Sequence, residues 1–466
     1  MTKLRKGDSP HLKVESLAFG GLGVAKYGDK VVFVRGAIPQ QTVKTAIIKK
    51  RKSYFEGIAL DVIEESEYYF KPPCPHFKYC GGCSHQNLYY TEQLNQKQKQ
   101  VEDIFLRLGG YESQKVNKIV GCVDVWNYRN KMEFTFSKNI WYENSNSPNM
   151  PLALGLHIPK RFDKILDISD CHIQDIECNS ILKLVKELSI DHDLSVWDVR
   201  KHVGFLRNVV IRKGFNTDEI MVNFITSEYD REKLIPIAKE LSTRFSKIIS
   251  IVNNINSRHG GSSQGQFEYN LYGKSVIHEK LGDYKFIISA NSFFQTNTKQ
   301  AEKLYQIILN ECKLTKKDVV YDLFCGTGSI SIFLANRAKH VFGFELVKSA
   351  IKDAKNNLKL NDIDNCTFFE GDLMNIFTNN NELENIPKPD VMVIDPPRSG
   401  MHPKTVNQVI EQSPKRIVYV SCNPSTQVRD IKFFTENSYN IINIQPVDMF
   451  PHTPHIENIV TMEIKK

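Results

Sequence analysis

The chain reads Val319-Val320-Tyr321-Asp322-Leu323-Phe324-Cys325-Gly326-Thr327-Gly328-Ser329 where an apolar strand pattern gives way to glycines and then to a helical pattern. Glycines at the end of a strand let the backbone approach a ligand closely at the carboxyl edge of a parallel sheet. From about residue 288 onward, strand and helix patterns alternate around this run. The alternation predicts an α/β, Rossmann-like domain over residues 288–466, with helices on both faces of a parallel sheet.

The residues around the glycines are typical of a nucleoside site. Glu345 ends the next strand, where a carboxylate can accept hydrogen bonds from both ribose hydroxyls. A dinucleotide would favour the fingerprint G-x-G-x-x-G, whereas the acidic Asp322 before the glycines suits the positively charged amino-acid end of S-adenosylmethionine. Asp372 follows the third strand and is placed to accept from the adenine amino group, or alternatively to cap the next helix. The sequence therefore favours S-adenosylmethionine as cofactor.

Two later strands end in residues that can carry chemistry. Asp395-Pro396-Pro397-Arg398 follows one apolar strand, and Ser421-Cys422-Asn423-Pro424 follows the next. Both motifs are therefore expected at the cofactor edge of the sheet. Acidic-proline loops also occur in enzymes that methylate amino groups, but a cysteine at the same edge indicates nucleophilic catalysis.

A thiol beside a methyl donor suits methylation of a pyrimidine carbon. Carbon 5 of uracil is too weak a nucleophile unaided, but addition of a thiolate to carbon 6 produces an enolate whose carbon 5 can attack the methyl group. A general base must then remove the carbon 5 proton so that the cysteine can leave. The run His452-Thr453-Pro454-His455-Ile456-Glu457 supplies candidates, and Glu457 opens a final strand, with a surface carboxylate as the alternative interpretation. The same chemistry would serve cytosine.

Residues 1–63 have the pattern of a small β module. Four strand patterns separated by glycine-rich turns cover residues 11–17, 31–35, 41–49 and 55–63. They predict an OB-like β-barrel, a fold that often binds RNA, with a purely structural module as the alternative. The formal net charge of +8 includes basic clusters such as Lys49-Lys50-Arg51-Lys52, which suit a phosphate backbone.

Residues 64–287 are predicted to form an α+β central domain that opens with a cysteine cluster. Cys74, Cys80 and Cys83 stand in the spacing C-x5-C-x2-C, and three thiolates so close together suit a metal. Cys171 is the expected fourth ligand. On chemistry alone, zinc and an iron–sulfur cluster are both open.

Together, these motifs resemble those of the RNA uracil-5-methyltransferase family, over nearly the whole chain. The resemblance rests on Ser292-Phe293-Phe294-Gln295-Thr296-Asn297, on the two motifs after the strands, and on Asp448-Met449-Phe450-Pro451-His452-Thr453 through Glu457. It implies Cys422 as nucleophile and Glu457 as general base. It also implies that one pocket for the cofactor and the target base is lined by Gln295, Phe324, Ser329, Glu345 and Asp395.

The cysteine spacing is similar to that of the family's 23S ribosomal RNA type, which carries an N-terminal TRAM barrel and a [4Fe-4S] cluster. The resemblance thus implies a [4Fe-4S] cluster on the four named cysteines, and methylation of carbon 5 of a uridine in 23S ribosomal RNA. One alternative is methylation of the T-loop uridine of transfer RNA by an archaeal-type enzyme that can share the barrel and the cluster. Another is an iron–sulfur RNA-binding protein with an inactive methyltransferase domain, against which the intact pair Cys422 and Glu457 argues.

The sequence also indicates where the protein acts. No apolar run approaches the length that a membrane span requires, and Met1-Thr2-Lys3-Leu4-Arg5-Lys6 lacks the apolar stretch of a secretory signal. We therefore expect a cytoplasmic protein without membrane contact. We also expect it to act as a monomer on structured RNA.

Overall fold

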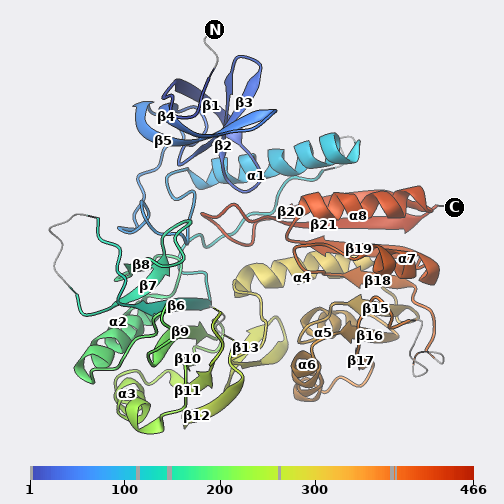
Figure 1. Cartoon of the computed structure of the whole chain (residues 1–466). Helices are drawn as coiled ribbons and strands as arrows, with labels where there is room; N and C mark the ends of the chain where they lie inside the picture. Colours follow the sequence, from blue (N-terminus) through green and yellow to red (C-terminus); the bar gives the residue numbers. More distant parts are fainter. Residues whose placement is uncertain are drawn as a thin grey trace.

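The computed structural model describes residues 4–111, 116–143, 150–260, 264–377, 383 and 386–465. These residues form a closed barrel at the N-terminus, a central sheet with two helices, and a C-terminal sheet with helices on both faces (Figure 1). The long helix α1 (Tyr90–Ile104) runs from the barrel to the C-terminal sheet. No helix in the described ranges is long and apolar enough to cross a membrane.

The N-terminal barrel closes in the strand order β1-β2-β3-β5-β4. Its strands are β1 (His11–Leu17), β2 (Gly23–Tyr27), β3 (Lys30–Arg35), β4 (Thr42–Lys50) and β5 (Tyr54–Glu64). Burial alternates along β1, so that Leu12 and Val14 enter the barrel core while their neighbours face outward. The N-terminal β-barrel predicted from the sequence is confirmed, and its fifth strand is β2, a short strand that the four strand patterns did not include.

The central part is built on a seven-stranded sheet in the order β12-β11-β10-β9-β6-β7-β8. Its strands are β6 (Lys131–Ser137), β7 (Ala153–His157), β8 (Ile165–Asp167), β9 (Leu206–Lys213), β10 (Ile220–Thr226), β11 (Ile248–Ile255) and β12 (Phe267–Gly273). Two helices pack on it, α2 (Ile176–Asp191) and α3 (Arg231–Arg244). Each helix begins after an aspartate, Asp175 or Asp230, whose side chain accepts a backbone N–H of the first turn.

The C-terminal sheet also has seven strands, in the order β17-β16-β15-β18-β19-β21-β20. Its parallel strands are β15 (Val319–Leu323), β16 (His340–Glu345), β17 (Cys366–Glu370), β18 (Val391–Ile394) and β19 (Arg416–Ser421). The last two, β20 (Tyr439–Val447) and β21 (Glu457–Ile464), pair antiparallel. Because β21 also runs antiparallel to β19, the start of β21 lies beside the end of β19.

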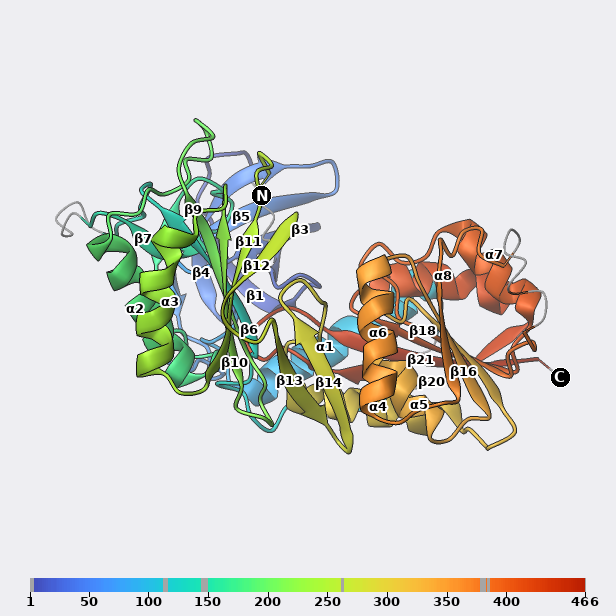
Figure 2. The ribbon, with the colours of Figure 1, turned by 90° about the horizontal axis from the view of Figure 1, so that it is seen from below.

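Helices cover both faces of this sheet, as the alternating pattern predicted. One face, carrying Val320 and Val393, packs against α4 (Thr298–Cys312), α5 (Ser329–Ala335) and α6 (Lys348–Leu360). The other face, carrying Tyr321 and Ile394, packs against α7 (Pro403–Gln412), α8 (Pro424–Glu436) and α1. Figure 2 shows this sheet and its helices beside the barrel and the central sheet. The strands β15 and β18 are buried along their whole length because both faces of the sheet are covered.

Two segments from the range expected for the central domain pack against the C-terminal sheet. Helix α1, which continues as a π-helical turn (Phe105–Gly109), contributes Val101 and Ile104 to the C-terminal core. The hairpin of β13 (Val276–Leu281) and β14 (Tyr284–Ser289) contributes to the core beneath α4 and α6. The boundary expected at residue 288 therefore falls inside β14, because an apolar pattern does not show which surface will cover it.

Candidate active site

Cys422 and Glu457 lie next to each other at the carboxyl edge of the C-terminal sheet. Ser421, the last residue of β19, pairs with Asn458 of β21, so the next step in the register brings Cys422 beside Glu457. Helix α8 begins just after the cysteine, and the Asn423 side chain caps it by accepting from Ser425 N. A strand end and a helix start thus fix the backbone of Cys422.

The carboxylates at this edge have a high proton affinity. Burial raises the pKa of Glu457 well above its usual value, and the nearby Asp395 raises it further. Burial also raises the pKa of Asp395, to about 7. For the half-buried Cys422, burial and then Glu457 raise the pKa to about 11. A carboxylate whose pKa is raised binds a proton more strongly than a free carboxylate does, which suits a group that must accept a proton from carbon.

Arg398 is the cation of the site. Its charge favours the thiolate of Cys422 and the ionised form of Glu457, and so lowers the pKa of both groups against the effect of burial. Its Nη2 donates to His455 Nδ1 over 2.9 Å, and burial lowers the pKa of that imidazole to about 4, so the ring is a neutral acceptor. The Arg398 carbonyl accepts from Asn423 Nδ2 over 3.1 Å, which connects the loop after β18 to the loop of the cysteine.

The glycine turn after β15 is held by Glu345. Its Oε2 accepts from Gly326 N over 3.1 Å, and its Oε1 accepts from Val347 N over 2.9 Å. Phe324 has a φ of +63°, and Gly328 a φ of +78° with the Phe368 ring 2.5 Å from where a Cβ would stand. The turn needs a glycine at that point because no side chain would fit.

Asp322 is the buried acidic group behind this turn. Its Oδ2 accepts from Ser331 Oγ over 2.5 Å, whereas its Oδ1 is buried without a hydrogen-bond partner among the described residues. Burial raises the pKa of Asp322 to about 7. An unpaired buried carboxylate oxygen is costly, so this atom fits a cationic ligand group such as the ammonium of S-adenosylmethionine.

Three further predicted residues have different settings. Ser329 Oγ lies 2.9 Å from the hydroxyl of the buried Tyr305 on α4. Asp372 Oδ1 accepts from Met374 N over 2.9 Å, which favours the capping role that the sequence left as an alternative. Gln295 lies between β14 and α4, where its carbonyl accepts from Asn130 Nδ2.

The four predicted metal ligands lie around the same cavity in the central part of the molecule. Cys74, Cys80, Cys83 and Cys171 are free thiols that line one cavity. Gly82 N donates to Cys80 Sγ over 3.3 Å, and burial raises the pKa of that thiol to about 11. Within the described ranges, no three His, Cys, Asp or Glu side chains are grouped as ligands of a metal ion.

Comparisons with known proteins show which proteins this chain is similar to. Residues 271–465 match the family model of tRNA (Uracil-5-)-methyltransferase. Uncharacterized RNA methyltransferases of Chlorobaculum tepidum and Bacteroides thetaiotaomicron are each 38% identical, the first over 99% of this chain and 97% of its own, the second over 96% and 100%. The chain belongs to the RNA uracil-5-methyltransferase family. It is an RNA methyltransferase that uses S-adenosylmethionine.

A solved structure is similar over the whole length. The tRNA (uracil-54, C5)-methyltransferase of Pyrococcus abyssi, in complex with S-adenosyl-L-homocysteine, is 28% identical to this methyltransferase, with a TM-score of 0.76, covering 97% of this chain and 100% of that chain. The likeness thus includes the barrel and the central sheet as well as the C-terminal sheet.

The structure also adds residues that the sequence did not assign to this site. Tyr305 contacts Ser329 from a helix that carries no motif, so no signal in the sequence could have revealed it. Arg398 stands in the acidic-proline motif, and its position before a cysteine-bearing strand was the available signal.

Proposed function

We propose that this methyltransferase methylates carbon 5 of a specific uridine in 23S ribosomal RNA through a covalent adduct between Cys422 and carbon 6 of the uracil. The observation that carries the proposal is the placement of a half-buried thiol beside a buried carboxylate, Glu457, at one strand edge. A nucleophile and a base are the two groups that this reaction demands of the protein.

The reaction follows from the two side chains. The Cys422 thiolate, favoured by Arg398, adds to carbon 6, and the electrons of the C5–C6 double bond move toward the carbonyl to form an enolate. Carbon 5 takes the methyl group of the sulfonium and leaves a thioether behind. Glu457 then accepts the carbon 5 proton, the double bond forms again and the thiolate leaves. The target base must leave its stack to reach Cys422, which an unpaired loop makes less costly.

The cofactor is proposed to lie along the ends of β15 and β16. The buried Asp322 would pair with its ammonium, and Glu345 with its ribose hydroxyls. Further contacts are proposed for Gln295, Phe324, Ser329, Asp372 and Asp395. For Asp372, a contact with adenine has to coexist with the bond to Met374 N.

The cavity in the central part is proposed to hold a [4Fe-4S] cluster on Cys74, Cys80, Cys83 and Cys171. Four free thiols around one cavity form the donor set that such clusters use. Zinc accepts the same four donors and is the alternative that a metal analysis would reveal. The cavity lies outside the C-terminal sheet, so the group would organise the surrounding loops and supply no reacting atom.

The choice of 23S ribosomal RNA rests on the cysteine spacing, which is similar to that of the family's 23S ribosomal RNA type. The five-stranded barrel is proposed to be a TRAM module that binds RNA, and its basic run Lys49-Lys50-Arg51-Lys52 suits phosphates. Transfer RNA is the second candidate, because the similar Pyrococcus abyssi structure is that of a tRNA (uracil-54, C5)-methyltransferase.

The test is transfer of a labelled methyl group from S-adenosylmethionine to unmodified 23S ribosomal RNA and, separately, to unmodified transfer RNA, with the product nucleotide identified by mass spectrometry. We expect 5-methyluridine in 23S ribosomal RNA. Label confined to transfer RNA would replace the ribosomal target by the second candidate, and methylcytidine would overturn the assignment of uracil.

A further inference from the structure

The loop between β20 and β21, residues 448–456, leads into Glu457 and is held by distant parts of the chain. All five of its backbone carbonyls from Asp448 to His452 accept hydrogen bonds from donors before residue 298. In the order of the accepting carbonyls from Asp448 to His452, the donors are Cys122 Sγ (3.1 Å), Asn297 Nδ2 (2.9 Å), Lys97 Nζ (3.2 Å), Tyr128 Oη (3.0 Å), and both Ser84 N (2.8 Å) and His85 N (3.0 Å).

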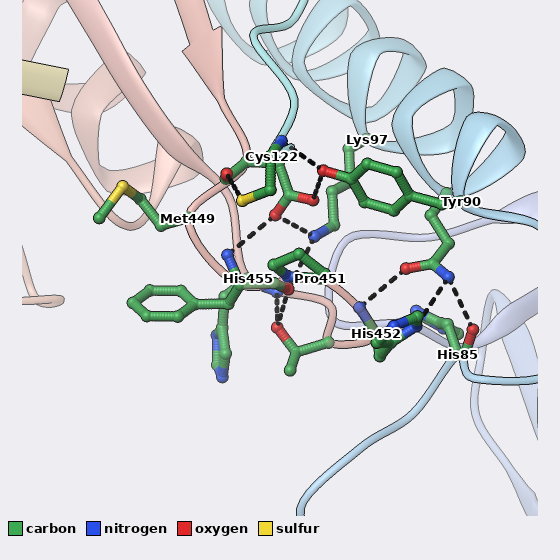
Figure 3. A network of polar contacts seen from close by, with 12 residues as sticks. His85, Tyr90, Lys97, Cys122, Met449, Pro451, His452 and His455 are labelled. Carbon is green, nitrogen blue, oxygen red and sulfur yellow. Dashed lines mark hydrogen bonds and ion pairs between the residues drawn. The ribbon is translucent and has the colours of Figure 1, made fainter. Parts of the chain in front are cut away.

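At the start of this loop lies a buried ion pair. Lys97 of α1 donates through Nζ to Asp448 Oδ1 over 2.7 Å, and the two side chains are only 3% and 0% exposed. Asp448 Oδ1 also accepts from Phe450 N over 3.0 Å, and Oδ2 accepts from the Tyr90 hydroxyl over 2.9 Å. Figure 3 shows Lys97 and Tyr90 reaching from the helix into the loop. Lys97 is therefore joined to both the side chain and the backbone of the loop.

One turn earlier on the same helix, Gln93 holds the middle of the loop. Its Oε1 accepts from His452 N over 2.8 Å, and its Nε2 lies 3.1 Å from His452 Nδ1. Burial lowers the pKa of His452 to about 3, so the ring is neutral and Nδ1 accepts from the amide. Trp126 stacks on the same ring, with centroids 3.8 Å apart. Since His452 has a φ of +65°, the loop turns sharply at a residue that is fixed from several sides.

A buried ion pair such as that of Lys97 and Asp448 is by itself weak evidence that the two residues stabilise the fold. Apolar side chains of similar volume often stabilise a core as well as a buried ion pair does, because both charges lose their hydration. What an ion pair with further hydrogen bonds provides is a fixed geometry. Here that geometry belongs to the loop that contains His455, which contacts Arg398, and that leads into Glu457.

We propose that Lys97 is a positioning residue for Glu457. Through Asp448 and the Phe450 carbonyl it sets the path of the loop so that the carboxylate of Glu457 reaches the carbon 5 proton of the methylated adduct. In that step the proton passes to Glu457, the C–H electrons form the C5–C6 double bond, and the S–C6 bond returns its electrons to the sulfur of Cys422. The inference rests on the proposed function and deepens it.

The two halves of the reaction should respond differently to a loss of Lys97. Cys422 stands at the end of β19, and Asp322 and Glu345 stand at the ends of β15 and β16, strands whose backbone pairing does not involve residues 448–456. Glu457 depends on that loop directly. We therefore expect Lys97→Met to leave addition and methyl transfer intact and to slow proton removal by at least about tenfold, as a small misplacement of a base can do.

RNA that contains 5-fluorouridine separates these steps. Its carbon 5 carries fluorine in place of the proton, so the reaction stops at the methylated adduct for any base. The RNA is the 23S ribosomal or transfer RNA transcript that accepts label, made with uridine or with 5-fluorouridine. The measured quantities are the rate of adduct formation on the fluorinated transcript and, on the normal transcript, the fraction of label in adduct that resists denaturing electrophoresis.

For Lys97→Met we expect an adduct rate on fluorinated RNA within about threefold of the unaltered protein, and an adduct that accumulates on normal RNA. Lys99→Met is the matched control, because Lys99 lies on the exposed face of the same helix, and it should release product as the unaltered protein does. Equal loss of both steps in Lys97→Met, or unchanged release, would overturn the inference.

A second variant covers a failure of Lys97→Met to fold. Lys97→Met/Asp448→Asn leaves no unpaired charge in the core, and it still lacks the donor to the Phe450 carbonyl. Accumulation of adduct in this variant supports positioning, whereas normal release shows that Lys97 only compensates the charge of Asp448. Glu457→Gln is run in parallel: if it too releases product freely, the proposed base is wrong, and not merely its positioning.

Discussion

Cys422 and Glu457 stand across the antiparallel pair of β19 and β21, one step beyond the partners Ser421 and Asn458. A parallel strand delivers the thiol and an antiparallel strand delivers the carboxylate to the same edge, although 34 residues of helix, strand and loop separate the two in the chain. Each side chain thus has its own support, α8 for the cysteine and the loop of residues 448–456 for the glutamate. Because different segments hold the two side chains, substitutions should be able to affect the nucleophile and the base separately.

Replacement of the thiol tests the nucleophile. Cys422→Ala should abolish methyl transfer, because without addition at carbon 6 the uracil carbon is too weakly nucleophilic. Binding of S-adenosylmethionine should change little, since the proposed contacts stand on other strands. The measurements are label transfer to RNA and calorimetric titration of the cofactor. Retained turnover would remove Cys422 as nucleophile.

Replacement of the base should stop the reaction one step later. Glu457→Gln keeps the shape of the side chain but cannot accept the carbon 5 proton, so the methylated adduct should persist. A band of protein joined to labelled RNA is expected in denaturing electrophoresis, with turnover lower by about 10²-fold or more. Cys422→Ala/Glu457→Gln is the control and should give no such band. Its appearance there would mean that another side chain forms the bond.

Local patterns in the sequence were sufficient to predict the strands whose ends carry the proposed catalytic and cofactor residues. The strands ending at Leu323, Ile394 and Ser421 are short apolar runs followed at once by glycine, proline or cysteine motifs, and the structure has strand ends there. Alternating side chains likewise predicted most of the barrel. These features depend on neighbours in the chain, which is why they could be recognised.

Contacts between distant residues could not be recognised in this way. Lys97 lies in a helix rich in glutamine and lysine, and its partner Asp448 is 351 residues away. A lysine in such a helix has the pattern of a solvated face, yet this one is buried because α1 crosses to the C-terminal part. Asp372 is the converse case: its position suited adenine, and the backbone N–H two residues later already occupies one of its oxygens.

The rate of addition to the uracil should rise with pH, because the attacking group is the thiolate of Cys422. Burial and Glu457 raise the pKa of Cys422 to about 11, so at lower pH the thiolate fraction increases about tenfold for each pH unit. The rate of adduct formation on 5-fluorouridine RNA should rise accordingly between about pH 7 and pH 9. An adduct rate that does not vary with pH would show that ionisation of the thiol does not limit addition.

Arg398 should affect the pH dependence of the rate of adduct formation. Its charge lowers the pKa of Cys422, so Arg398→Met should raise it and displace the profile to higher pH. A displacement of one pH unit corresponds to an adduct rate lower by about tenfold at a fixed pH, with recovery at alkaline pH. A uniform loss at every pH would instead mean that Arg398 acts on RNA binding or on folding.

Substitution of the cysteines tests the metal group of the central part. After anaerobic purification we expect about four irons and four sulfides per chain, and Cys80→Ser should reduce both because it removes one ligand. Cys178→Ala is the matched control, since Cys178 is a buried thiol of the same core that does not line the cavity. One zinc per chain in place of iron would overturn the cluster, and iron retained in Cys80→Ser would overturn the ligand assignment.

The buried carboxylate Asp322 should make cofactor binding depend on pH. Burial raises its pKa to about 7, and a bound ammonium favours the ionised form, so affinity should be full above that pH and fall as pH decreases through it. Below pH 7 the affinity for the cofactor should fall, with Kd rising by about tenfold for each pH unit.

Asp322→Asn should weaken cofactor binding roughly tenfold to hundredfold at pH 8, which is the effect of losing one charged hydrogen bond. It should also flatten the dependence, leaving only the part due to Asp395, whose pKa is likewise about 7. Asp390→Asn, at the opposite edge of the same sheet, should bind as the unaltered protein does. Calorimetric titration at several pH values measures all three proteins, and a Kd that is unchanged in Asp322→Asn would show that the ammonium group binds elsewhere.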